Sequence, residues 1–268
     1  MTRTAIIAGR GALPAALVAA LPERPFVAAL EGFNPAGLVP DLAFRVERLV
    51  PFLRRLEEEG VARVCFAGAV QRPRLDPALF DPDTATMVPR LLAAMGQGDD
   101  ATLREVLAIF EEAGFALAGV EEIAPALVPG AGVLCGEVTE RDRADAARAA
   151  GIVAALGRVD VGQGAVVQQG LCLAVEALPG TDAMLAGVAA IPAGLRPAGA
   201  RGLFYKAPKP AQDRRIDLPA LGVETVRRAA EAGLGGIAFE AGGVICLDLP
   251  AMQAEAAARG LFLWAREA

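Results

Sequence analysis

The chain has no histidine among its 268 residues, and this absence excludes several common catalytic centres. A Ser-His-Asp triad, a zinc site with histidine ligands and a histidine general base all need an imidazole ring. Any chemistry must therefore use carboxylates, lysines or a metal ion that carboxylates hold.

The chain also lacks a basic excess and a long apolar run. Its net charge of −6 and its isoelectric point near 5.0 argue against nucleic-acid binding, which needs a basic surface along the phosphates. It has no stretch of ~20 uncharged apolar residues and no basic start followed by an apolar run, so we expect neither a spanning helix nor a signal peptide. These features predict a soluble, cytoplasmic protein.

Cysteine is scarce and scattered along the chain. Cys65, Cys135, Cys172 and Cys246 each lie in or beside an apolar, strand-like run. This pattern is typical of buried thiols. The spacing fits neither a metal knuckle nor the disulfide framework of a small secreted domain.

The first half of the chain alternates strand-like and helix-like stretches. This alternation predicts an N-terminal α/β domain with a Rossmann-like parallel sheet. We expect strands over residues 4–8, 25–30, 61–67 and 115–123, and helices over residues 14–21, 51–59 and 99–113.

The turn after the first strand contains Gly9 and Gly11. Free N–H groups at the start of the following helix, near Gly11 and Leu13, would suit a phosphate. A tight turn without a ligand explains the glycines equally well, and the missing third glycine disfavours a dinucleotide-dependent oxidoreductase. Arg72, after the strand over residues 61–67, could face an anion in the same crevice or could be an ordinary exposed loop arginine.

A stretch rich in proline and glycine over residues 124–132 predicts a linker. We therefore place one domain at residues 1–130 and a C-terminal α/β domain at residues 131–268. In the second domain we expect strands over residues 165–168, 171–177, 201–206, 236–240, 244–247 and 261–265, and helices over residues 140–156, 222–232 and 251–259. Thr181 is placed to cap a further helix, and its hydroxyl beside Asp182 could equally meet a phosphate or a metal.

The segment KAPKPAQDRRIDLP, residues 206–219, should be a stiff, irregular loop. Its prolines fix φ and remove N–H donors, so neither a helix nor a central strand can pass through it. It carries the cations Lys206, Lys209, Arg214 and Arg215 and the carboxylates Asp213 and Asp217. The cations suit phosphate oxygens, and the carboxylates could hold a hard cation or orient a water. A solvated surface loop whose charges pair with one another is the alternative.

Longer motifs extend over nearly the whole chain. They are IAGRGALP at residues 7–14, CFAGAVQRP at 65–73, GDD at 98–100, DVGQGAVVQQG at 160–170, LAVEALPGTDAML at 173–185 and KAPKPAQDRRIDLPALG at 206–222. With these motifs the sequence resembles the UDP-2,3-diacylglucosamine pyrophosphatases of the LpxI type, a family of lipid A biosynthesis. It departs from the family pattern at Arg10 and Ala211, where glycine is usual.

The resemblance implies a two-domain α/β hydrolase that binds its lipid in a cleft between the domains. It implies cleavage of UDP-2,3-diacylglucosamine to UMP and 2,3-diacylglucosamine 1-phosphate (lipid X), supported by Mg²⁺, with Mn²⁺ able to replace it. We expect a cytoplasmic chain that can contact the inner membrane peripherally and can form a homodimer.

The resemblance also assigns roles to residues of this sequence. By similarity, loss of the Asp217 carboxylate is expected to abolish catalysis. We expect Lys206 and Lys209 to offset the charge of the pyrophosphate. The expected metal ligands are Asp217, Asp182 and Asp213, and the expected substrate contacts are Gly11, Leu13, Arg72, Gln163, Thr181, Asp182 and Arg214.

A non-catalytic carrier of a nucleotide or phosphate lipid is the competing hypothesis. Such a protein could hold a phosphate with the same glycine turn and basic loop. It would gain nothing from carboxylates beside its ligand unless a metal lay between them, because like charges repel. The carboxylates therefore favour a hydrolase.

Overall fold

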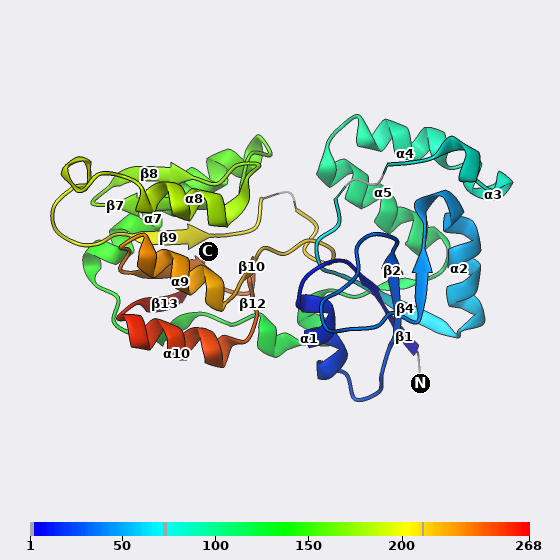
Figure 1. Cartoon of the computed structure of the whole chain (residues 1–268), viewed down its shortest axis with the longest axis horizontal. Helices are drawn as coiled ribbons and strands as arrows, with labels where there is room; N and C mark the ends of the chain where they lie inside the picture. The colour runs from blue at the N-terminus through cyan, green and yellow to red at the C-terminus, as the bar shows by residue number, and fades with distance from the viewer. Residues whose placement is uncertain (1–2, 72–73, 211) are drawn as a thin grey trace. The chain divides into compact units, whose positions relative to one another are not determined.

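The computed structural model describes residues 3–71, 74–210 and 212–268, without the side chains of Asp99 and Asp100. Contacts within the chain divide it into two units (Figure 1). Unit 1 comprises Met1–Pro125 and Asp213–Asp217, and unit 2 comprises Ala126–Gln212 and Leu218–Ala268. Each unit has its own sheet and its own core, so each is described separately.

Unit 1 is built on a five-stranded sheet whose described pairings are all parallel. The strand order is β3-β2-β1-β4-β5, the order in which doubly wound sheets arrange these strands. The strands are β1 (Arg3–Ala8), β2 (Phe26–Leu30), β3 (Leu42–Phe44), β4 (Val61–Ala67) and β5 (Ala116–Leu117). Buried, continuous apolar runs such as those of β1 and β2 are what a covered parallel sheet requires.

Helices cover the sheet of unit 1. They are α1 (Leu13–Ala20), α2 (Leu49–Glu58), α3 (Pro82–Ala85), α4 (Val88–Met95), α5 (Asp99–Glu112) and α6 (Val120–Ile123). The main core lies between the sheet and helices α2, α4 and α5. Phe44 stacks on Phe52 of α2 with ring centroids 3.9 Å apart, and Phe66 meets Phe110 of α5 edge-on at 5.0 Å. These aromatic contacts fix both helices to one face of the sheet.

Unit 2 contains a six-stranded mixed sheet in the order β6-β13-β11-β9-β7-β8. Strands β13, β11 and β9 are parallel, whereas β6, β7 and β8 run antiparallel to their neighbours. The bounds are β6 (Gly132–Cys135), β7 (Gly164–Gln168), β8 (Leu171–Val175), β9 (Leu203–Lys206), β11 (Gly236–Glu240) and β13 (Phe262–Arg266). A separate parallel pair joins β10 (Ala220–Leu221) to β12 (Ile245–Cys246).

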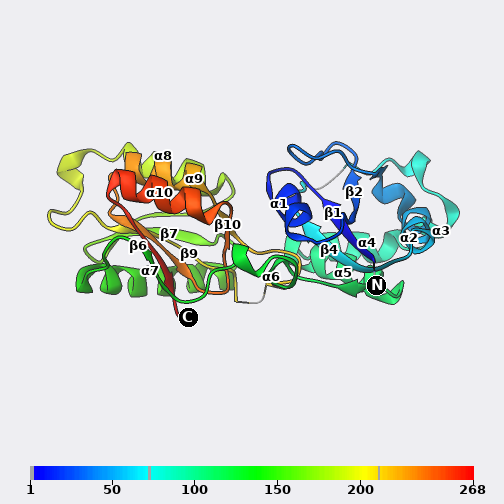
Figure 2. The same cartoon turned by 90° about the horizontal axis from the view of Figure 1, so that it is seen from below.

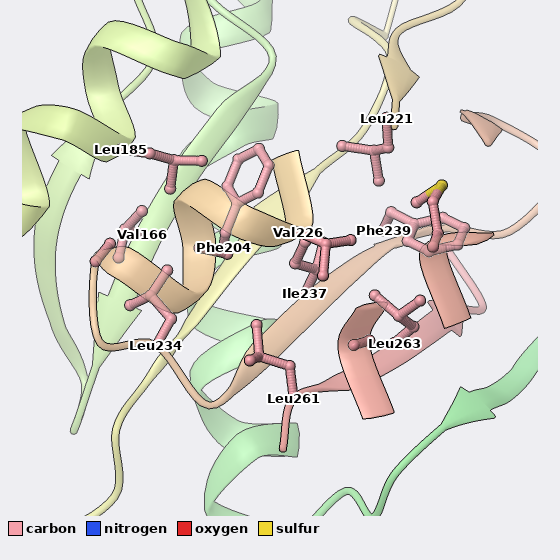
Figure 3. Packing of buried hydrophobic residues seen from close by; sticks show 14 of the residues in the cluster. Val166, Leu185, Phe204, Leu221, Val226, Leu234, Ile237, Phe239, Leu261 and Leu263 are labelled. Atoms are coloured by element: carbon pink, nitrogen blue, oxygen red, sulfur yellow. The ribbon is translucent and has the colours of Figure 1, made fainter. Parts of the chain in front are cut away.

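The two faces of this mixed sheet are covered by different helices. Helix α7 (Glu140–Arg158) lies on one face, and α8 (Gly180–Ala189), α9 (Val223–Glu231) and α10 (Leu249–Arg259) lie on the other (Figure 2). Figure 3 shows the larger core, where Phe204, Ile237 and Leu263 of the central strands meet Leu185 of α8 and Val226 of α9. Burial on both faces explains why the central strands are almost uniformly apolar.

Most predicted elements of both units are confirmed within a few residues, and the α/β fold is confirmed. The strand expected over residues 115–123 is wrong in its second half. Only Ala116–Leu117 pairs with β4, and the chain then turns into α6, whose start is capped by Glu122 Oε1 accepting the N–H of Gly119 at 3.0 Å. Strands β3 and β6 were not expected; β6 begins within the stretch interpreted as a linker.

Two side-chain predictions are also wrong. Thr181 does not cap α8, because the helix already begins at Gly180 and has no side-chain cap. Cys172 is exposed on β8, whereas Cys65 and Cys246 are buried as expected. Burial raises the pKa of each of these two thiols to about 12. All four thiols are free.

The described helices are too short or too polar to cross a bilayer. A search of the described part of the chain finds no helix with the length and apolar character that a membrane span needs.

Candidate active site

The strand ends of unit 2 bring distant residues to one edge of the mixed sheet. Lys206 is the last residue of β9, and it is in register with Gly164, the first residue of antiparallel β7. Because β8 runs antiparallel to β7, Glu176, which directly follows β8, lies at the same edge. Thr181 comes from the first turn of α8. The sheet topology therefore assembles these side chains.

The Lys206 ammonium is buried in this cluster. Lys206 is 6% exposed, and its Nζ donates a hydrogen bond of 2.6 Å to Thr181 Oγ1. The same hydroxyl donates to Glu176 Oε1 at 2.9 Å, and Lys206 Nζ lies 3.5 Å from that carboxylate oxygen. A buried cation needs such a counter-charge and such hydrogen bonds to remain charged.

The spacing Gly162-x-Gly164 allows Glu176 to approach. A Cβ at Gly162 would lie 2.0 Å from the carbonyl oxygen of Glu176. A Cβ at Gly164 would lie 2.7 Å from Glu176 Oε2 and 2.8 Å from the ring of Phe204. Real Cβ atoms essentially never show any of these three distances, so glycine at both positions is a packing requirement of this cluster.

Lys209 belongs to the same unit and is held by a second carboxylate. Its Nζ forms an ion pair with Asp160 Oδ1, just before β7. Its backbone N–H donates to Gln212 Oε1 at 3.0 Å, and Gln163 Nε2 donates to the same oxygen at 2.7 Å. Gln163 thus orients the loop that carries Lys209.

Both lysines of this cluster therefore face carboxylates. Glu176 lies beside Lys206, and Asp160 lies beside Lys209. Asp160 is half exposed, at 50%, whereas the Glu176 side chain is 12% exposed. A phosphate can compete more easily for Lys209, since an exposed ion pair is weak and screened by solvent.

Within the basic loop, Asp213–Asp217 belong to unit 1. As predicted, the described residues of the loop after Lys206, the last residue of β9, form neither a helix nor a strand. Asp213 accepts hydrogen bonds from Arg215 Nε at 3.0 Å and Nη2 at 2.7 Å, and these bonds lower the pKa of Asp213. Arg215 Nη1 also donates to Glu111 Oε1 of α5 at 2.8 Å. Arg214 is exposed and Asp217 is partly buried.

The glycine turn of unit 1 is joined to the loop after β4. The N–H of Gly9 donates to Ala67 O at 2.7 Å, and Arg10 and Ala69 exchange two backbone hydrogen bonds of 2.9 Å. A Cβ at Gly9 would lie 2.7 Å from Ala69 O, so this glycine permits close approach of the two loops. The N–H groups of Gly9 and Arg10 are thus occupied.

The predicted phosphate contacts of this turn lie further along the chain. Gly11 is exposed, with φ of 98°, in the left-handed region that favours glycine. Leu13 opens α1. Arg72 lies outside the described residues, so its predicted contact stays a prediction.

The three predicted metal ligands are divided between the units. Asp182 is on α8 of unit 2, where Oδ1 lies 3.4 Å from Arg228 Nε, whereas Asp213 and Asp217 belong to unit 1. Within the described residues, no group of three or more His, Cys, Asp or Glu side chains is arranged to hold a metal ion. The metal site and its ligands therefore stay predictions.

Sequence reasoning missed Glu176, Asp160 and Gln212. Each lies inside or beside a motif that was recognised, yet none was assigned a role. The sequence pattern that could have identified Glu176 is a carboxylate at the end of an apolar run, with a hydroxyl residue, Thr181, five positions later. Strand ends of this kind commonly form sites in α/β proteins.

Comparisons with known proteins agree with this division into two parts. Residues 3–127 match the model of the LpxI N-terminal domain, and residues 130–264 match that of the LpxI C-terminal domain. The chain is 41% identical over 272 aligned residues to the UDP-2,3-diacylglucosamine pyrophosphatase LpxI of Caulobacter vibrioides, covering 98% of this chain and 97% of that protein. The chain therefore belongs to the LpxI family.

Proposed function

We propose that this chain hydrolyses the pyrophosphate of UDP-2,3-diacylglucosamine to UMP and 2,3-diacylglucosamine 1-phosphate (lipid X) in lipid A biosynthesis. The main support is the 41% identity, over 98% of the chain, to the UDP-2,3-diacylglucosamine pyrophosphatase LpxI of Caulobacter vibrioides. Both LpxI domains are matched. We therefore propose the complete reaction for this chain, because neither domain of the family is missing from it.

The lysine cluster of unit 2 supports a reaction at a pyrophosphate. In the reaction, the oxygen of a water molecule bonds to one phosphorus, and the bond from that phosphorus to the bridging oxygen breaks. Negative charge grows on the departing phosphate, and fixed cations stabilise it. Lys206 and Lys209 are cations held in place by Thr181, Glu176 and Asp160.

Asp217 is the carboxylate that we assign to the attacking water. A general base must be ionised and must not be fully buried among apolar groups. Asp217 is partly buried in the turn that follows Asp213, whose carbonyl oxygen accepts the N–H of Asp217 at 3.2 Å. Both oxygens of Asp213 accept hydrogen bonds from Arg215, so we assign that carboxylate to holding Arg215.

We also propose that Mg²⁺, or Mn²⁺ in its place, supports the reaction. Mg²⁺ is commonly held by one or two carboxylates together with substrate phosphates, so a cage of three carboxylates is not required. We propose Asp217 as the ligand because it lies in the motif that resembles the LpxI family, within the part of the chain that matches the LpxI C-terminal domain. When bound, the ion would neutralise charge on the phosphate oxygens.

The proposed substrate also suggests where in the cell the protein acts. The acyl chains of the substrate favour a membrane, because each buried methylene contributes about 0.8 kcal/mol. We therefore place the chain in the cytoplasm with peripheral contact at the inner membrane. A homodimer remains a prediction.

A chelator titration tests the proposal. Purified protein is incubated with UDP-2,3-diacylglucosamine, and UMP release is measured while Mg²⁺ is titrated against a chelator. We expect release to stop in chelator and to return with Mg²⁺ or Mn²⁺. Full activity in excess chelator would contradict metal support, and substrate binding without UMP release would identify a carrier instead.

A further inference from the structure

The carboxylate of Glu176 contacts the side chains of Thr181 and Lys206. Its Oε1 accepts the hydroxyl of Thr181 at 2.9 Å and lies 3.5 Å from Lys206 Nζ. Among the residues that the structure describes, no donor reaches Oε2, which is buried. Glu176 is thus committed to the ammonium group and to the hydroxyl beside it.

Another buried acid of unit 2 is used differently. Asp145 is fully buried, and its two oxygens accept the backbone N–H groups of Gln169 at 2.9 Å and Gly170 at 2.8 Å, beside an ion pair with Arg141. It holds the turn between β7 and β8, which is a structural role. Among the described residues no backbone N–H donates to the Glu176 carboxylate, so stabilising a turn does not explain its burial.

We infer that Glu176 is a positioning residue for Lys206, acting directly and through the hydroxyl of Thr181. The inference rests on the proposed function, in which Lys206 stabilises charge on the departing phosphate. It adds two members to that site, and it gives Thr181 a role other than contact with substrate.

The physical reason is the freedom of a lysine side chain. An ammonium group ends a flexible stem with rotatable donors, so it has no fixed direction of its own. Glu176 at the end of β8 and Thr181 in the first turn of α8 are both set by backbone structure. A cation fixed before the reaction stabilises the transition state without reorganising during it.

The Thr181 hydroxyl is well suited to link the two charges. A hydroxyl has one donor hydrogen and two acceptor positions. Its hydrogen goes to Glu176, and one acceptor position takes the Lys206 ammonium at 2.6 Å. Removing the hydroxyl should therefore disturb Lys206 even though both charges remain.

Substitutions that keep side-chain size test the inference. For Glu176→Gln and Thr181→Val, we expect kcat to fall about 10- to 100-fold with KM nearly unchanged, because a misplaced cation affects the transition state more than binding. Thr181→Ser keeps the hydroxyl and should restore most of the activity. A rise in KM at constant kcat for Thr181→Val would show instead that Thr181 binds substrate.

A double-mutant cycle with Lys206→Met provides the decisive measurement. If Glu176 acts through Lys206, Glu176→Gln has little further effect on kcat in the Lys206→Met background. Asp145→Asn is the matched control: it removes a buried carboxylate remote from the cluster, so it should lower the unfolding temperature while leaving kcat unchanged. Additive effects of Glu176→Gln and Lys206→Met would overturn the inference.

The same measurements separate this inference from the proposed function. Absence of UMP release by the unmodified chain would overturn both. Turnover by the unmodified chain, with unchanged kcat in folded Glu176→Gln and Thr181→Val, would overturn only the positioning role. If Glu176→Gln does not fold, the comparison of Thr181→Val with Thr181→Ser decides the question.

Discussion

Replacing Gly164 with alanine inserts one methyl group between Glu176 and the core of unit 2. The new Cβ would lie 2.7 Å from Glu176 Oε2 and 2.8 Å from Phe204 Cε2. Phe204 is fully buried, so its ring has no free space to enter. Gly164 is not among the residues with positive φ, so the backbone itself accepts alanine. The whole effect should therefore come from the collision.

The expected cost follows from the collision with a packed core. Overpacking a core by one methyl group costs typically ~1–3 kcal/mol. A loss of about 2 kcal/mol should lower Tm by about 4–8 °C, at roughly 2–4 °C per kcal/mol for a domain of this size class. Because the methyl group also displaces Glu176, kcat should fall as well.

The single tryptophan makes this effect measurable in one unit. Trp264 is on β13 of unit 2, so its fluorescence reports the unfolding of that unit. Gly151→Ala is the matched control, because Gly151 is exposed within α7 and a Cβ there meets nothing within 4 Å. The control should be more stable by about 0.5–1 kcal/mol. If Gly164→Ala unfolds like the unmodified chain, the packing argument for the glycine spacing is refuted.

Three further predictions concern the basic loop. Asp217→Ala should abolish UMP release while leaving the thermal unfolding of the chain unchanged, because a loop carboxylate has little packing to lose; near-normal turnover would show that Asp217 is not catalytic. Lys209→Ala should lower kcat more than it weakens lipid X binding, measured by calorimetry, and unchanged kcat with a large loss of affinity would reverse the assigned roles. The third concerns Asp213, whose pKa Arg215 lowers in the folded chain. Its stabilisation, at most about 1 kcal/mol for such a pair, should be complete above about pH 4 and disappear as the pH falls through the lowered pKa. Calorimetry of Asp213→Asn should accordingly show a loss of stability at pH 7 that shrinks as the pH falls below about 4, and a loss that stays constant with pH would contradict this.

The sequence predicted the elements whose local pattern is strong. The strand expected over residues 61–67 matches β4 (Val61–Ala67), and the strand expected over residues 236–240 matches β11 (Gly236–Glu240). Both are short apolar runs bounded by turns. By contrast, β3 (Leu42–Phe44) and β6 (Gly132–Cys135) were not predicted. Each is a strand because a neighbouring strand pairs with it, and three or four residues are too few to show an alternating pattern.

The candidate site could be predicted only in part, because tertiary pairing assembles it. Lys206 and Lys209 were found from their charge and their motif. Glu176 was not, since its nearness to Lys206 depends on β7 pairing with both β8 and β9. The predicted C-terminal domain, residues 131–268, also included the whole basic loop, whereas contacts assign Asp213–Asp217 to unit 1. A single boundary in the sequence cannot describe a unit that consists of two separate segments of the chain.

Phosphorus NMR of the reaction in ¹⁸O-labelled water tests the central claim most directly. Purified chain, UDP-2,3-diacylglucosamine and Mg²⁺ are incubated, and both phosphate products are observed against the Asp217→Ala variant. The account predicts equal amounts of UMP and lipid X, with the label in one of the two, and an unchanged pyrophosphate signal with the variant. An intact pyrophosphate with the unmodified chain, or equal cleavage by Asp217→Ala, would contradict it.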